Sequence, residues 1–163
     1  SFGNAHKLMP KNPAAALSLA VMLDTNGNID QARAAYEDVL RIDPENTQAL
    51  NNLAYIKADE GVDLDFALGY AQRALQHAPN NSGISDTHSL IYLRKKLTSQ
   101  ALQMFRDLVN REPANPSLHM YLGMALYDAG EKGQAKKEVE TALRYKPSPT
   151  EQAKIKDLEA RIG

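Results

Sequence analysis

The spacing of alanine and proline constrains the fold of this 163-residue chain more than any other feature. Four alanines recur at intervals of 35, 34 and 34 residues, namely Ala32, Ala67, Ala101 and Ala135. Four prolines follow the same intervals, namely Pro44, Pro79, Pro113 and Pro147, and one further step of 34 residues back reaches Pro10. Two residue types that share one period predict an internal structural repeat.

The last copy of this repeat, residues 122–147, has the pattern of two helices folded back on each other. Apolar residues fall three and four positions apart on either side of Gly130, as they do on the buried faces of amphipathic helices. Gly130 interrupts the pattern, because glycine readily adopts the backbone conformation in which a chain leaves a helix. Pro147 ends the second helix, since proline donates no backbone hydrogen bond. The repeat is therefore a helical hairpin.

A period of 34 residues with these landmarks resembles the tetratricopeptide repeat (TPR) family. The family pattern has a large–small pair in the first helix, a glycine near the turn, and alanine, aromatic, alanine and proline in the second helix. The first copy matches it with Leu19, Ala20, Gly27, Ala32, Tyr36 and Pro44. The third copy keeps Ala101, Phe105 and Pro113, but has His88-Ser89 as the pair and Lys96 for the glycine. The resemblance implies an all-α fold, a right-handed α-solenoid of helix–turn–helix repeats.

The repeat divides the chain into six segments. We expect residues 1–12 to be the tail of a preceding partial repeat or a scar from a cloning vector, and we favour a fragment of a longer array. Residues 13–46, 47–81, 82–115 and 116–149 are expected to be TPR 1 to TPR 4, and residues 150–163 a C-terminal capping helix. The helices are expected at about 14–26, 29–42, 47–60, 64–77, 83–95, 98–111, 116–129 and 132–145.

Several helix ends carry recognisable cap residues. Asn12 and Asn115 each precede a proline, which suits an N-cap followed by proline at the first helical position. Asn28 with Gln31 resembles a capping box, and Ser148 begins another cap-like start. After Ser148, apolar residues at four-residue intervals predict a helix that covers the last repeat and exposes its lysine, aspartate and arginine side chains to water.

Composition excludes several classes of function. The chain has no cysteine, which rules out disulfides and cysteine-ligated metals, and no apolar run approaches the ~20 residues of a membrane span. Nineteen Lys and Arg balance 20 Asp and Glu in an interspersed order, so electrostatics give no reason to expect nucleic acid or direct membrane insertion. We expect a soluble protein, and its repeat sequences resemble those of bacterial TPR proteins. The sequence does not decide between the bacterial cytoplasm and the periplasm.

The sequence contains no recognisable catalytic, cofactor or metal site. Its four histidines, His6, His77, His88 and His119, form no HxxH or HExxH pair and fall in different segments. No nucleophile–base arrangement or glycine-rich phosphate loop is present. We therefore expect no enzyme activity, no metal and no cofactor. We expect His88, which replaces a core leucine, to be packed and hydrogen-bonded in the core.

The resemblance to TPR proteins also implies a binding surface, because such arrays usually bind a peptide or helix along a concave groove lined by first helices. The corresponding positions form the predicted peptide-binding groove: Leu17, Val21, Asn51, Asn52, Tyr55, Asp59, Asp86, Leu90, Arg94, Met120, Met124, Tyr127 and Asp128. We expect an apolar and aromatic floor, centred on Tyr55, Leu90, Met124 and Tyr127. We expect an acidic rim at Asp24, Asp59 and Asp128. The carboxylate clamp of chaperone-binding TPR proteins is absent, because Leu17 and Val21 replace its basic and amide side chains.

Three functions are consistent with these features. The first is a protein–protein interaction scaffold that binds a protein or peptide partner in the groove. The second is a substrate-positioning accessory domain of a larger enzyme. The third is a self-associating assembly module whose open repeat ends stack between molecules.

Overall fold

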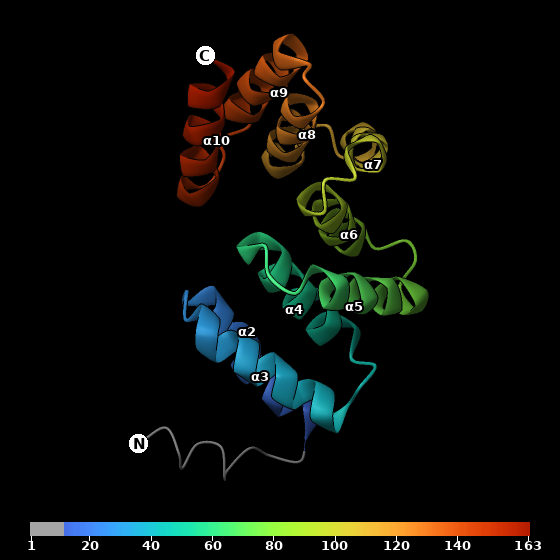
Figure 1. The fold of residues 1–163 in the computed structure, drawn as a ribbon. Coiled ribbons are helices and arrows are strands. Elements are labelled where there is room, and N and C mark those ends of the chain that lie inside the picture. Colours follow the sequence, from blue (N-terminus) through green and yellow to red (C-terminus); the bar gives the residue numbers. More distant parts are fainter. Residues whose placement is uncertain (1–11) are drawn as a thin grey trace. The chain divides into compact units, whose positions relative to one another are not determined.

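A computed structural model describes residues 12–163, and these form helices and connecting turns with no strand. The first four helices are α2 (Pro13–Thr25), α3 (Ile29–Ile42), α4 (Thr47–Glu60) and α5 (Leu64–His77). The remaining helices are α6 (Ser82–Arg94), α7 (Thr98–Arg111), α8 (Pro116–Asp128), α9 (Lys132–Arg144) and α10 (Pro149–Ile162) (Figure 1). Every helix predicted from the sequence is present, and each boundary agrees within one residue. The expectations for Phe2, Ala5, His6 and Pro10 lie outside the described residues.

The chain divides into two compact units within α6, after Ile84. In the N-terminal unit, α2 packs on α3, α3 on α4, and α4 on α5. In the C-terminal unit, which begins at Ser85, α7 packs on α8, α8 on α9, and α10 on both α8 and α9. The pairs α2–α3, α4–α5 and α8–α9 thus form hairpins, as the sequence pattern predicts. The division into four repeats stays a proposal.

The cores confirm the small and large positions of the repeat. Ala32, Ala67, Ala101 and Ala135 are all fully buried, and so are the large side chains of Tyr36 and Phe105. Two helices approach closely at Gly123 in α8, where an added Cβ would lie 3.3 Å from Val139 Cγ2 and 3.4 Å from the carbonyl oxygen of Ala135 in α9. Small residues at these positions let neighbouring helices pack at the density of a protein interior.

Side-chain caps account for the starts of several helices. The side-chain oxygen of Asn12 accepts a hydrogen bond from Ala14 N at 2.9 Å, and that of Asn115 accepts one from Ser117 N at 3.1 Å. Ser148 and Glu151 form a complete capping box at the start of α10. The capping box predicted at Asn28 is wrong, because this residue makes no side-chain cap hydrogen bond. Its ψ of 64° departs from the extended backbone that the other asparagine caps adopt.

Lys96 stands at the turn position where the repeat pattern has a glycine, and it shares the backbone conformation of the turn glycines. Gly27, Gly61 and Gly130 have φ angles of 76°, 71° and 82°, which place them in the left-handed region. Lys96 has a φ of 61° and therefore adopts the same conformation with a side chain that disfavours it. The helical hairpin therefore imposes the left-handed turn conformation at Lys96, although the side chain disfavours it.

Candidate functional site

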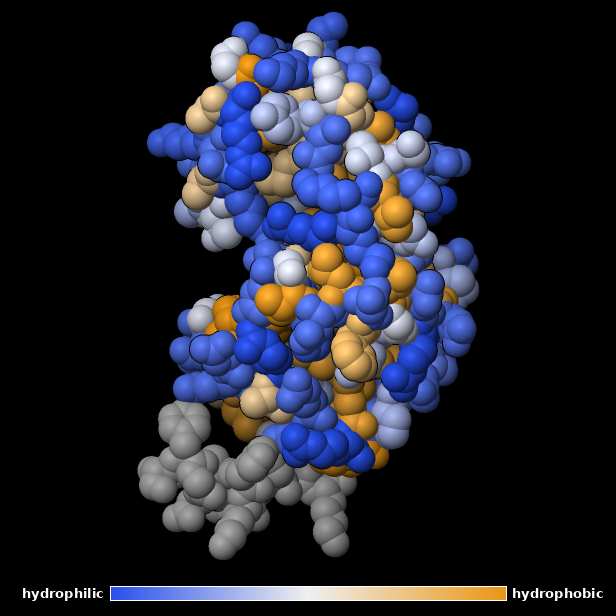
Figure 2. All heavy atoms as spheres, in the orientation of Figure 1, coloured by the Kyte–Doolittle hydropathy of each residue, from blue (hydrophilic) through white to orange (hydrophobic). Residues whose placement is uncertain are grey.

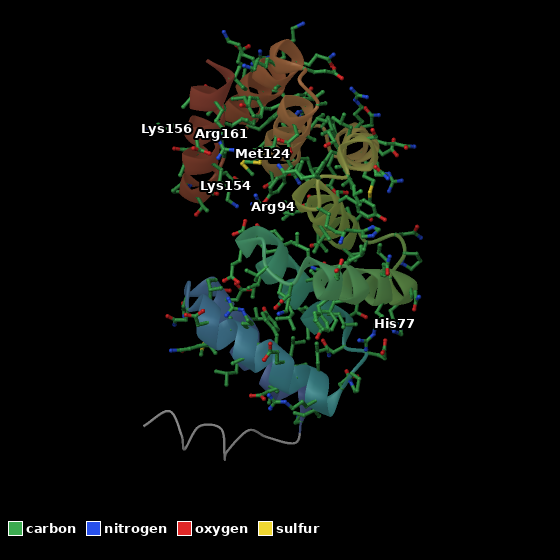
Figure 3. All side chains as sticks on the ribbon, in the orientation of Figure 1. His77, Arg94, Met124, Lys154, Lys156 and Arg161 are labelled. Atoms are coloured by element: carbon green, nitrogen blue, oxygen red, sulfur yellow. The ribbon has the colours of Figure 1, made fainter. Side chains whose placement is uncertain are left out.

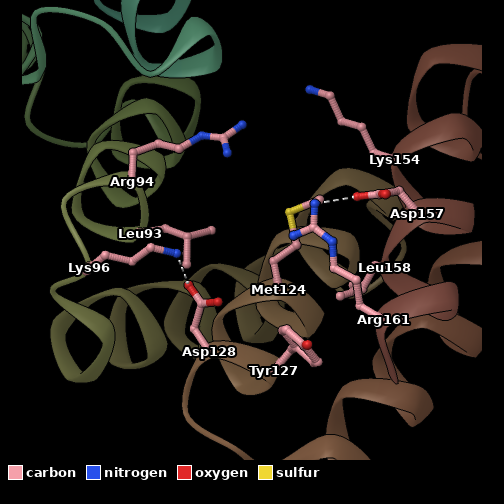
Figure 4. Close-up of a pocket in the computed structure, with 10 residues that line it drawn as sticks. All are labelled: Leu93, Arg94, Lys96, Met124, Tyr127, Asp128, Lys154, Asp157, Leu158 and Arg161. Atoms are coloured by element: carbon pink, nitrogen blue, oxygen red, sulfur yellow. Dashed lines mark hydrogen bonds and ion pairs between the residues drawn. The ribbon is translucent and has the colours of Figure 1, made fainter. Parts of the chain in front are cut away.

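The C-terminal unit contains a pocket of about 290 Å³ between α6, α8 and α10 (Figure 4). Its lining is shared among the end of α6, the turn that follows, the second half of α8 and one face of α10. The lining residues are Leu93, Arg94, Lys96, Met124, Tyr127, Asp128, Lys154, Asp157, Leu158 and Arg161. We call this the C-terminal pocket.

The apolar part of the C-terminal pocket is formed by Leu93, Met124 and Leu158. Leu93 and Leu158 are buried, whereas Met124 and Tyr127 are half-buried and retain surface toward the pocket. Methionine adapts its shape to a ligand, and tyrosine offers a large contact area with a polar tip. This part of the pocket therefore suits an apolar side chain.

The polar part of the pocket is dominated by cations. Lys96 Nζ lies 3.0 Å from Asp128 Oδ2, and an Arg161 guanidinium nitrogen lies 2.7 Å from Asp157 Oδ2. Because the lining includes four cationic side chains and two carboxylates, its formal charge is +2. Arg94 and Lys154 lie on opposite sides of the pocket, with Met124 between them (Figure 4). The predicted acidic rim stays a prediction, and its member Asp128 forms an ion pair with Lys96 at this site.

The helical period explains why α10 contributes so much of the pocket. Lys154, Asp157, Leu158 and Arg161 are spaced three, four and seven residues apart, which places them along one face of a helix. Ile155, fully buried, and Leu158 hold this helix against the rest of the unit. In Figure 3, Lys154 and Arg161 lie on the side of α10 that faces Met124, whereas Lys156 lies on the opposite side.

The structure brings together four residues of the predicted groove: Arg94, Met124, Tyr127 and Asp128. Two others, Leu90 and Met120, are each 1% exposed and belong to the core. Their assignment to the groove is corrected, because side chains without accessible surface cannot contact a partner.

Asp86 is a further predicted groove residue, but it does not line the pocket. Its Oδ1 is buried and has no hydrogen-bond partner in the described part of the chain. Burial, followed by the negative charges of Glu112 and Glu151, raises the pKa of Asp86 to about 7. Asp86 is thus a buried carboxyl group whose charge is destabilised by its surroundings.

In the N-terminal unit, Tyr36 connects two predicted residues. Asn52 Nδ2 donates a hydrogen bond to the Tyr36 hydroxyl at 2.8 Å, and this hydroxyl donates one to Asp24 Oδ2 at 3.1 Å. Burial, the largest cause, raises the pKa of Tyr36 to about 12. Asn52 and Asp24 are therefore tied to the core of this unit.

The other predicted residues of the N-terminal unit differ in exposure. Leu17 and Val21 are half-buried and pack against the core, and Asn51 and Asp59 are half-buried as well. Tyr55 is 38% exposed, so it is the large apolar side chain of this set with the most surface for a partner.

Sequence reasoning missed six residues of the C-terminal pocket: Leu93, Lys96, Lys154, Asp157, Leu158 and Arg161. The polar residues of residues 150–163 were expected on a solvent-facing side. The spacing of the four α10 residues was the available signal, but its meaning depends on which side of α10 meets α8. Only the packed structure supplies that orientation.

Two histidines of the described residues, His119 and His88, pack against other side chains. His119 is buried, with Nδ1 2.6 Å from Glu138 Oε2, Nε2 2.8 Å from the carbonyl oxygen of Pro113, and its ring stacked on Tyr145. His88 lies edge-on to Tyr92, and its buried Nε2 has no hydrogen-bond partner among residues 12–163. The expected hydrogen bonding of His88 is therefore missing at this nitrogen. Within the described range, no group of three or more His, Asp or Glu side chains is placed to hold a metal ion.

The hydrophilic character of the surface is visible in Figure 2, where hydrophilic side chains predominate over the C-terminal unit and hydrophobic atoms appear between them. Among residues 12–163, no helix combines the length and the apolar character that crossing a membrane requires.

Comparison with known proteins identifies similar sequences and folds. The sequence matches the tetratricopeptide repeat family over residues 1–54 and 92–162. No curated protein matches the chain.

Solved structures with a similar fold include two TPR proteins. A thermophilic TPR protein of Thermus thermophilus has a TM-score of 0.78 and 23% identity, with 93% of this chain and 84% of that chain covered. A TPR protein of Parabacteroides merdae has a TM-score of 0.78 and 16% identity, with 99% and 61% covered. PilF of Pseudomonas aeruginosa has a TM-score of 0.68 and 22% identity, with 91% and 68% covered. At these identities the likeness shows a shared all-α repeat fold.

Proposed function

The chain belongs to the tetratricopeptide repeat family, and from this premise we propose that it is a non-catalytic scaffold that binds a segment of a partner protein. TPR proteins are generally non-catalytic, and their fold is typical of protein–protein interaction. We place the binding site in the C-terminal pocket, with Met124 and Tyr127 as its apolar contacts.

The size of the pocket carries this proposal. Pockets for cofactors and drug-sized ligands usually measure roughly 300–1,000 Å³. At about 290 Å³, and lined on three sides by helices, the C-terminal pocket suits one or two side chains of a peptide or helix. Binding energy at such sites concentrates in a few residues that become desolvated, and Met124 and Tyr127 have the half-buried position that this requires.

Selection from a random peptide library displayed on phage tests the proposal without assuming the chemistry of the partner. We expect the selected peptides to lose more than ~1 kcal/mol of binding free energy when Met124 or Tyr127 is replaced by alanine. Met104→Ala is the matched control, because Met104 is a half-buried methionine of α7 that does not line the C-terminal pocket.

Circular dichroism of each variant checks that helical content is kept. Peptides that tolerate Met124→Ala and Tyr127→Ala but not Met104→Ala would place the binding surface on the other face of the unit. A selection that yields no specific binder would count against a peptide-binding function.

A further inference from the structure

We infer that the outer side of α5 binds a second copy of this chain, so that Phe66 of each copy packs over Gly69 of the other. The inference is independent of the proposed function, because α5 belongs to the N-terminal unit and lines no part of the C-terminal pocket.

Helix α5 has two sides with different surroundings. It packs against α4, and its three alanines that fall on one side are fully buried: Ala67, Ala71 and Ala74. Phe66, Gly69 and Arg73 follow one another at intervals of three and four residues, so they form a stripe on a side turned away from those alanines. We call these three residues the outer stripe of α5.

Phe66 exposes a large apolar side chain on this stripe. Its exposed fraction is 67%, the highest among the large apolar side chains of residues 12–163. Burying such a ring against a partner releases apolar surface from water and is favourable. Single exposed apolar side chains are common on protein surfaces, so Phe66 alone does not identify a binding site.

Gly69 supplies the second observation. Glycine is unfavourable in the interior of a helix, and packing within this chain does not require it here. Apart from its chain neighbours and its own helix backbone, no atom of the described residues lies within 4 Å of a Cβ built on Gly69. The missing side chain therefore leaves a notch on the outer stripe, one helical turn from Phe66. An aromatic ring and a notch on one helix are complementary to a second copy of the same helix.

A two-fold symmetric pair uses this complementarity twice. With the two-fold axis midway between Phe66 and Gly69, two α5 helices lie antiparallel, and each phenyl ring lies over the partner's Gly69. Small residues at such a contact let two helix axes approach to about 8 Å. Both notches are then filled, and both exposed rings are covered.

The charges at the two ends of α5 favour the same antiparallel arrangement. Asp63 and Asp65 stand at its start, whereas Arg73 and His77 stand toward its end. Asp63 and Arg73 form ion pairs within their own copy, yet 58% and 38% of their side-chain surface stays exposed. Antiparallel packing brings the acidic start of each helix near the basic end of the other and opposes the two helix dipoles. Parallel packing would bring like charges together.

The test begins with the oligomeric state of the full chain. One helix face buries less than the ~1,600 Å² of a standard interface, so we expect a weak dimer. Analytical ultracentrifugation between about 10 μM and about 1 mM protein should show the average mass rising from that of one chain toward that of two.

Variants separate association from folding. Phe66→Ser and Gly69→Leu should each lower the association constant about tenfold or more. Because leucine favours a helix more than glycine does, urea unfolding of Gly69→Leu should show a fold at least as stable as the wild type. Leu143→Ser and Gly133→Leu are the matched controls in α9, because Leu143 is 42% exposed and a Cβ added at Gly133 likewise meets nothing within 4 Å among the described residues. Neither control should change association.

Cross-linking tests the orientation of the two helices. The chain has no cysteine, so introduced thiols report on the dimer without background. Asp65 and Gln72 are exposed positions of α5 that meet across the antiparallel pair but lie apart in a parallel one. Oxidation of a mixture of Asp65→Cys and Gln72→Cys should therefore give more mixed disulfide dimer than random pairing of the two variants gives.

A wild type that stays monomeric up to about 1 mM overturns the inference, because the outer stripe then has no second copy as its occupant. Unchanged association of Gly69→Leu also overturns it, as does an equal effect of Leu143→Ser and Phe66→Ser, since the contact would then lie outside α5. An excess of the two symmetric disulfide dimers over the mixed one would refute the antiparallel arrangement.

Discussion

Replacement of Asp86 with asparagine should stabilise the protein above about pH 7 and have little effect near pH 4. Burial and the nearby carboxylates of Glu112 and Glu151 raise the pKa of Asp86 from 3.8 to about 7. Its Oδ1 is buried without a hydrogen-bond partner in the described residues. At neutral and higher pH, the folded protein therefore holds an unfavourable negative charge that the unfolded chain exposes to water.

The sign of the pH dependence follows from the raised pKa. The folded state binds the Asp86 proton more tightly than the unfolded state does, so this contribution is fully present below about pH 4. It is lost as the pH rises through about 7. The difference between the two pKa values corresponds to about 4 kcal/mol, which is an upper limit for the gain from removing the charge. A buried amide without partners costs ~1–3 kcal/mol, so the expected net gain is roughly 1–3 kcal/mol.

Urea unfolding followed by circular dichroism at about pH 4, 6 and 8 measures this difference. The free energy of unfolding of the wild type should fall relative to that of Asp86→Asn as the pH rises. Asp107→Asn is the control, because Asp107 is an exposed aspartate of α7 in the same unit. A difference between Asp86→Asn and wild type that stays constant with pH would refute the assignment of a raised pKa to Asp86.

Three other substitutions should change stability in defined directions, measured by thermal and urea unfolding. Tyr36→Phe removes two hydrogen bonds from a fully buried hydroxyl and should cost ~1–3 kcal/mol; an unchanged melting temperature would contradict this. Lys96→Gly relieves the strain of a φ of 61° and should stabilise by up to ~1 kcal/mol, because the exposed ion pair between Lys96 and Asp128 contributes little to stability. Lys96→Ala keeps the strained backbone and should not stabilise the protein. His88→Leu should stabilise by ~1 kcal/mol, because it removes a buried nitrogen without a partner among the described residues; a clear loss of stability would show that His88 is satisfied.

The sequence predicts the helices well because the information that defines them is local. The three- and four-residue spacing of apolar side chains, glycine at left-handed turns and asparagine before proline each act within a few residues. The exception at Asn28 has a local cause too, since its backbone conformation keeps the side chain from acting as a cap. The cap at Ser148 is confirmed, because its extended backbone allows the reciprocal hydrogen bonds with Glu151.

The binding surface is predicted less completely, because it depends on how helices rotate about their axes. Met120 and Met124 are one helical turn apart, yet Met120 is buried in the core and Met124 lines the pocket. The pattern of apolar residues does not separate these two positions, since methionine suits both. The charge of the pocket was also hidden, because the interspersed charges of the chain come together only when α10 places Lys154 and Arg161 beside α8.

The double role of α10 decides which substitutions can report on binding. Leu158 is buried, lines the pocket, and would lie 3.5 Å from a Cβ added at Gly123, so it supports the packing of α10 against α8 as well as the apolar floor. A change at Leu158 therefore alters stability and binding together, and a loss of affinity there has two explanations. Lys154 lines the same pocket from the same helix but is only half-buried, so its replacement changes the charge of the pocket with little loss of core packing. The cations, rather than the apolar residues of α10, are for this reason the positions at which binding can be measured separately from folding.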